Sequence, residues 1–86
     1  MTEECKRLYV SNLNYSVTPL QLKELFNKAG PVLFYKIVVE KSLGRSRGFG
    51  FVEMENLADA KRAIKELHGT KYAGRTISVD YAHPPP

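Results

Sequence analysis

The sequence predicts an α+β fold, a two-layer sandwich with the element order β-α-β-β-α-β and a four-stranded antiparallel sheet covered by two helices on one face. Four segments have the alternation or β-branched composition of strands, and two segments between them have the three- and four-residue spacing of amphipathic helices. At 86 residues, the chain is long enough for one hydrophobic core and too short for two. Two helices with one apolar stripe each can cover only one face of such a sheet, so the other face should meet solvent.

The first predicted elements are a strand and a helix. Residues 7–11 alternate between polar and apolar side chains, with Leu8 and Val10 directed to the core. A helix is expected over residues 19–28, because Thr18 is a favourable N-cap, proline occupies the first helical position and glutamine follows three residues after the cap. A Gly-Pro pair then ends this helix.

The second strand is expected over residues 32–40, which are apolar and rich in β-branched residues. We predict that Tyr35 and Ile37 point inward and that Phe34 and Lys36 point outward. Lys36 decides this assignment, because a charged amine is less costly to leave in water than to bury, and its neighbours in the strand then alternate.

The second half of the chain repeats the strand-helix pattern. A basic loop over residues 41–46 leads to a strand over 47–54 and a helix over 57–67. A turn over residues 71–75 is followed by a final strand over 76–82. Asn56 is the expected N-cap of the second helix, and Gly69 is expected to end that helix in the left-handed conformation.

Two phenylalanines in the third predicted strand could serve the core or a binding surface. Phe49 and Phe51 are two residues apart, so their rings share one face. The core can be filled without them, from Leu8, Val10, Leu22, Leu25, Phe26, Val32, Tyr35, Ile37, Val52, Met54, Ala60, Ala63, Ile64, Leu67, Ile77, Val79 and Tyr81. Gly50 is better placed inward, where a missing side chain lets a helix approach closely. Phe49, Phe51 and Tyr9 then lie on the uncovered face, and an exposed aromatic cluster marks a binding surface.

Composition narrows the class of protein. Thirteen Lys and Arg residues against nine Asp and Glu give a net charge of +4, which favours a polyanionic partner. Cys5 is the only cysteine, so there is no intramolecular disulfide and no Cys/His set with metal-binding spacing. We expect no cofactor and no metal. No apolar run reaches the ~18 residues of a membrane span, and the chain does not start like a signal peptide. The sequence therefore predicts an intracellular protein without membrane contact, in the nucleus, the cytoplasm or both.

Residues 47–54, RGFGFVEM, resemble the RNP1 octapeptide of RNA recognition motif domains, and residues 8–13, LYVSNL, resemble their RNP2 hexapeptide. The likeness extends over about residues 6–83 and implies a ferredoxin-like fold, single-stranded RNA binding and no catalysis. Met54 departs from the pattern, because the octapeptide usually ends in Phe or Tyr. This position should face the core, so the departure concerns packing more than binding.

The resemblance also implies roles for individual residues. Tyr9, Phe49 and Phe51 match the residues that stack on bases, and Arg47 matches the basic residue that contacts phosphate. Lys41 and Arg45, in the adjoining loop, are further expected phosphate contacts. Candidates for reading base edges border the rings: Arg7, Phe34, Lys36, Ser78, Asp80, Ala82 and His83.

Other functions remain open on the sequence alone. The domain could bind chiefly a protein partner, or it could bind single-stranded DNA, since stacking does not distinguish the two sugars. The small acylphosphatases share this topology, but the exposed face offers no set of acid, base and nucleophile; Glu53 and Asp80 are isolated carboxylates. A metal chaperone of similar topology would need paired cysteines.

The expected organisation is a flexible segment over residues 1–6, a single domain over 7–83 and a proline-rich tail or linker over 84–86. The expected partners are single-stranded RNA and other ribonucleoprotein components, with the domain itself a monomer. Its biological role is expected in RNA processing or post-transcriptional regulation, and the stacking residues do not select particular bases.

Overall fold

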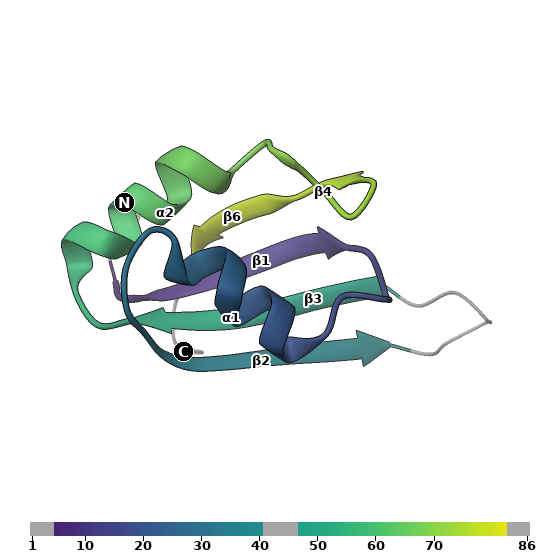
Figure 1. The fold of residues 1–86 in the computed structure, drawn as a ribbon, viewed down its shortest axis with the longest axis horizontal. Helices are drawn as coiled ribbons and strands as arrows, with labels where there is room; N and C mark the ends of the chain where they lie inside the picture. Colours follow the sequence, from purple (N-terminus) through teal and green to yellow (C-terminus); the bar gives the residue numbers. More distant parts are fainter. Residues whose placement is uncertain (1–4, 41–46, 83–86) are drawn as a thin grey trace.

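The predicted order of strands and helices is present in the computed structural model, which describes residues 5–40 and 47–82 (Figure 1). In chain order the elements are β1 (Arg7–Leu13), α1 (Pro19–Asn27), β2 (Val32–Glu40), β3 (Arg47–Met54), α2 (Leu57–Leu67), β4 (Lys71–Tyr72), β5 (Arg75–Thr76) and β6 (Ser78–Tyr81). The α+β class and the two-layer arrangement are thereby confirmed.

The main sheet has the strand order β2-β3-β1-β6, and each neighbouring pair is antiparallel. The strands that carry the two sequence motifs, β1 and β3, are therefore adjacent at the centre of the sheet. Both helices lie on the same side of the sheet, in front of it in Figure 1. The opposite face carries the outward side chains of all four strands.

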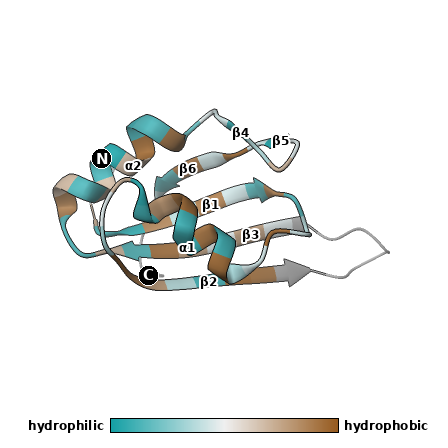
Figure 2. Ribbon diagram, in the orientation of Figure 1, coloured by the Kyte–Doolittle hydropathy of each residue, from teal (hydrophilic) through white to brown (hydrophobic). Residues whose placement is uncertain are grey.

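The core lies between the helices and the near face of the sheet. Leu8, Val10, Val52 and Met54 on the central strands are fully buried. The remaining residues of the predicted inward set are either buried or packed against this cluster, so the inward assignments are confirmed. In Figure 2 brown and teal segments alternate along both helices, as expected when every turn contributes apolar residues to one face and polar residues to the other. The inward position of Met54 shows that the unusual end of the octapeptide is a packing feature.

The helix ends follow their local sequences closely. The Thr18 hydroxyl accepts a hydrogen bond from the Gln21 amide at 3.2 Å, and the Gln21 side chain accepts one from the Thr18 amide at 2.9 Å. This is the predicted capping box. Asn56 occupies the N-cap position of α2, but its side chain donates to the Asp59 carboxylate instead of capping the backbone. Gly69 has a φ of +80°, which confirms its left-handed conformation after α2.

Two predicted strand boundaries were wrong. β1 does not end at residue 11 but continues to Leu13, because the β1–β3 register shifts between Val10 and Leu13 and returns the Leu13 side chain to the core. The residue in the shift, Asn12, has a φ of +62°. Local alternation cannot reveal such a shift, since the inserted residue breaks the period of two.

The final strand is also divided. β4 and β5 form a small hairpin whose two turn residues, Ala73 and Gly74, both have positive φ, as a two-residue primed turn requires. The Ile77 amide donates to the carbonyl oxygen of Thr70, and strand pairing with β1 begins only at Ser78. Residues 75–76 therefore belong to the hairpin rather than to the main sheet.

The free edge of β6 is partly covered by the end of α2. The Val79 amide donates to Nδ1 of His68 at 3.0 Å. His68 is the C-cap residue of α2, and its side chain thus supplies an acceptor to a strand edge. Such cover satisfies a main-chain donor that would otherwise be available to another chain.

Candidate nucleic-acid interface

Three aromatic side chains gather on the face of the sheet that the helices leave uncovered. The ring of Tyr9 lies 5.8 Å from that of Phe49 and 5.5 Å from that of Phe51, measured between centroids. The two phenylalanine rings are 6.1 Å apart and nearly perpendicular, at 87°. All three are partly exposed. We call Tyr9, Phe49 and Phe51 the ring cluster.

The strand register explains how residues far apart in sequence form the ring cluster. Tyr9 on β1 is paired directly with Phe51 on β3, and Phe49 is one alternation away on the same face. On the inner face of β3, Gly50 brings its backbone close to Leu22 of α1 and to the Lys36 carbonyl oxygen. Gly50 therefore lets the inner face of β3 lie close to α1, while Phe49 and Phe51 on the outer face remain accessible to solvent.

One row of side chains crosses the sheet with opposite charges at its ends. Lys36 is paired with Phe51, which is paired with Tyr9, which is paired with Asp80. Lys36 and Asp80 are both exposed. A ligand on the rings therefore meets an ammonium group on the β2 side and a carboxylate on the β6 side. The first suits a phosphate, and the second suits an amino group on a base edge.

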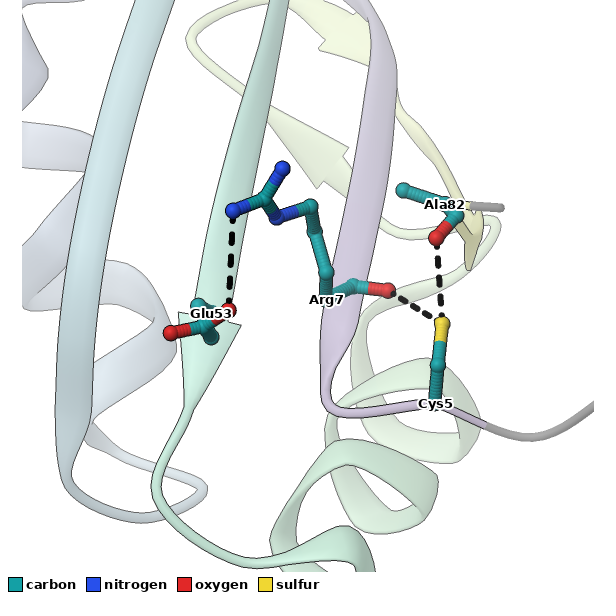
Figure 3. A network of polar contacts seen from close by, with 4 residues as sticks. All are labelled: Cys5, Arg7, Glu53 and Ala82. Carbon is teal, nitrogen blue, oxygen red and sulfur yellow. Dashed lines mark hydrogen bonds and ion pairs between the residues drawn. The ribbon is translucent and has the colours of Figure 1, made fainter. Parts of the chain in front are cut away.

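A second group lies one row further along the sheet. Arg7 forms an ion pair with Glu53 at 3.6 Å (Figure 3). The Arg7 guanidinium also lies 5.8 Å from the ring centroid of Phe34. Glu53 was predicted to be an isolated carboxylate, which is wrong: Arg7 and Glu53 are directly paired across β1 and β3. Phe34 is 44% exposed, so it extends the apolar surface toward the β2 edge.

Ala82 is less open than the sequence suggests. Its amide donates to the Arg7 carbonyl oxygen at 2.9 Å, and its own carbonyl oxygen lies 3.1 Å from the Cys5 thiol (Figure 3). Both main-chain groups of Ala82 thus have partners within the domain. Cys5 and Lys6 are likewise held to the domain, since the Lys6 carbonyl oxygen accepts from the Met54 amide.

The structure describes some of the remaining predicted site residues and not others. Ser78 and Asp80 are exposed on β6, as expected. Arg47 begins β3 and is paired with Glu40 of β2. The predictions for Lys41, Arg45 and His83 fall outside the described residues.

Asn12 and Arg75 are polar residues at the border of the ring cluster that the sequence did not single out. Both line an open pocket of about 410 Å³ next to Tyr9 and Phe49. The Arg75 guanidinium donates to Oδ1 of Asn12 at 2.8 Å. The sequence feature that could have revealed Arg75 is the Ala-Gly pair at residues 73–74. A tight hairpin at this pair directs Arg75 back toward β1.

Within residues 5–40 and 47–82, no His, Cys, Asp and Glu side chains form a group of three or more that could hold a metal ion. Over the same residues, neither helix has the length and apolar character needed to cross a bilayer.

Comparison with known proteins identifies the family. The profile of the RNA recognition motif matches residues 8–78. The putative RNA-binding protein RbpE of Nostoc sp. is 43% identical over 77 residues, which cover 90% of this chain and 78% of that protein. The chloroplastic RNA-binding protein CP33 of Arabidopsis thaliana is 42% identical over 79 residues, 92% of this chain. The chain spans about a quarter of the length of that protein, 24%.

A solved structure of an RNA recognition motif with bound RNA has the same fold as this chain. The Rna15 RNA recognition motif, determined with bound RNA (GU), superposes with a TM-score of 0.81 at 26% identity and covers 93% of this chain and 85% of that chain. The profile match, the relatives and the shared fold together confirm the resemblance seen in the two peptide motifs. The chain belongs to the RNA recognition motif family.

Proposed function

We propose that this chain binds single-stranded RNA by stacking bases on the ring cluster. The observation that carries the proposal is the position of Tyr9, Phe49 and Phe51, whose centroids lie within 6.1 Å of one another on the uncovered face of the sheet. Unstacked bases present flat π-surfaces that aromatic side chains can contact, at about 1–3 kcal/mol per base. Proteins that share the family and the fold are described as RNA-binding, which supports the same function here.

The geometry of the rings limits how RNA can lie on them. Phe49 and Phe51 are almost perpendicular, so they cannot both stack flat on two parallel bases. Either the two bases are rotated relative to each other, or one ring contacts sugar while the other stacks. The individual phenylalanines should therefore contribute unequally to affinity.

Charged residues beside the rings provide contacts that do not depend on base type. Lys36 is exposed and directly paired with Phe51, which supports a contact between its amine and the bound strand. We propose phosphate contacts for Arg47, from the octapeptide, and for Lys41 and Arg45, from the adjoining basic loop. Each such contact releases counterions, so affinity should fall with salt, by a slope of about −0.7 per phosphate for single strands.

The test is a fluorescence anisotropy titration with labelled single-stranded RNA. Phe51→Ala and Phe49→Ala should each weaken binding, by about 5- to 150-fold if one full stacking contact is lost. Leu20→Ala is the matched control, because Leu20 is a large exposed side chain, at 55%, on α1. It should leave affinity unchanged. Wild-type affinity in both phenylalanine variants would refute stacking on the ring cluster.

The same titrations separate the alternatives. If a DNA oligonucleotide of the same sequence binds with the same affinity as the RNA, the 2′-hydroxyl is not recognised. Amide chemical shifts that change only in α1 and α2, with none in the sheet, would favour a protein partner over RNA. Arg47→Ala should flatten the salt dependence; an unaltered slope would mean that Arg47 does not touch phosphate.

We place this binding in RNA processing or post-transcriptional regulation, and we propose that the domain acts as a monomer beside other ribonucleoprotein components, in the nucleus or the cytoplasm. Several relatives are named chloroplastic, which adds a compartment to test. RNA recovered after crosslinking in the cell of origin, together with light scattering of the purified domain, would check the process and the monomeric state.

A further inference from the structure

The pocket beside the ring cluster combines apolar walls with a fixed polar group. Its lining consists of Tyr9, Ser11, Asn12, Leu13, Gly48, Phe49 and Arg75. Its volume of about 410 Å³ is within the range of small-ligand sites, ~300–1,000 Å³. Two members of the ring cluster line it, so RNA stacked on these rings would pass directly over its opening.

The Asn12 side chain is restrained by a hydrogen bond at each end of its amide. Its φ of +62° belongs to the left-handed region, which asparagine tolerates better than most residues. Its Nδ2 donates to the Thr76 carbonyl oxygen at 2.6 Å, and its Oδ1 accepts from Arg75 at 2.8 Å. Both ends of the amide are therefore used within the protein, which makes Asn12 a positioning residue for Arg75.

Arg75 has donors to spare. A guanidinium carries five N–H donors, and the Asn12 bond uses one of its nitrogen atoms. The residue is exposed and lines the pocket. The hairpin that carries it is tied to the end of β1 a second time, by the Asn14 side chain, which donates to the Ala73 carbonyl oxygen at 3.0 Å. These bonds restrain the hairpin and the guanidinium, which reduces the ordering entropy lost when a ligand binds.

The base that best fits such a group is guanine. Its O6 and N7 atoms are two adjacent acceptors that match the parallel donors of a guanidinium, whereas adenine offers N7 beside an amino group, which would face another donor. The aromatic walls from Tyr9 and Phe49 suit the flat faces of a purine. We propose that this pocket is a guanine subsite in which Arg75, positioned by Asn12, donates to O6 and N7. The inference rests on the proposed RNA binding.

The test measures base preference instead of total affinity. A uridine oligomer with one central guanosine is compared with oligomers that carry adenosine, inosine or 7-deazaguanosine at that position. Inosine keeps O6 and N7 and should bind like guanosine, while 7-deazaguanosine lacks N7 and should bind more weakly. Wild type should prefer guanosine over adenosine by about 5- to 150-fold, as a bidentate pair allows.

Substitutions should then remove the preference selectively. Arg75→Lys keeps the charge but loses the fork, so the guanosine to adenosine ratio should approach one while binding of the adenosine oligomer changes little. Asn12→Gly keeps the left-handed backbone and releases Arg75, and it should lower the same ratio. Arg62→Lys, the same exchange at an exposed position on α2, is the matched control and should preserve the ratio.

The outcomes separate this inference from the proposed function. Suppose that wild type binds the oligomers and that Phe51→Ala lowers the affinity for all of them. If Arg75→Lys then leaves the guanosine preference intact, the guanine subsite is refuted and RNA binding stands. If Arg75→Ala lowers the affinity for every oligomer equally and flattens the salt dependence, Arg75 is a phosphate contact. This result would also refute the subsite. If wild type binds none of the oligomers, both proposals fail.

Discussion

Adding one methyl group at Gly50 should destabilise the fold without touching the face that carries the ring cluster. A Cβ atom at this position would lie 2.7 Å from the Lys36 carbonyl oxygen and 3.0 Å from Cδ2 of Leu22. The leucine can shift, but the carbonyl oxygen belongs to the backbone of β2 and can move only with that strand. Gly50→Ala should therefore cost about 1–3 kcal/mol, the usual range for an overpacked core.

This free energy converts into a measurable shift in melting temperature. For a domain of this size, 1 kcal/mol corresponds to about 4–8 °C, so Tm should fall by roughly 4–24 °C in a circular dichroism melt. Ser78→Thr also adds one methyl group, but at an exposed strand position, and should stay within about 0.5 kcal/mol of wild type. At a temperature where Gly50→Ala remains folded, its RNA affinity should match wild type, because the methyl group and the rings lie on opposite faces of β3.

An unchanged Tm in Gly50→Ala would contradict this prediction, because it would mean that β2 and β3 separate at little cost. A loss of RNA affinity in the folded variant would also contradict it, since the two faces of β3 would then be coupled. Phe51→Ala supplies the opposite pattern, with affinity reduced more than stability.

Three further changes test the local structure. Thr18→Ala removes the capping box of α1 and should cost about 0.5–2 kcal/mol in urea unfolding, while Thr18→Ser should retain most of it. Leu13→Ala should cost about 2–5 kcal/mol in the same assay, because Leu13 is 1% exposed at the end of β1; a negligible cost would argue against the extension of β1 to this residue. His68→Ala removes the acceptor for the Val79 amide, so hydrogen exchange at Val79 should accelerate, and an unchanged exchange rate would contradict this bond.

The elements that the sequence predicted best are those with local causes. Thr18 and Gln21 form their capping box within one helical turn, and α2 spans residues 57–67 as its periodicity indicates. The inward and outward sides of β3 were also correct, because alternation along a strand depends only on the backbone. Tyr9, Phe49 and Phe51 could be assigned to the bare face for the same reason, once the two helices were counted.

The errors occurred where distant segments decide the local structure. The end of β1 depends on a register shift against β3, and Asn12 adopts its left-handed conformation in contact with residues 75 and 76. Glu53 seemed isolated because its partner Arg7 is 46 positions earlier, a separation that only sheet pairing removes. The pocket was missed for this reason as well, since its lining comes from three segments.

The sequence by itself determined the order of elements, the inward faces and the three aromatic rings on the open side of the sheet, because periods of two and 3.6 residues are properties of the local backbone. Only the tertiary structure decided which side chains meet across that surface. Strand register joins Tyr9 to Phe51 and Arg7 to Glu53, and the folded hairpin brings Arg75 to Asn12. Contacts of this kind depend on pairing between strands far apart in the chain, which no local pattern encodes.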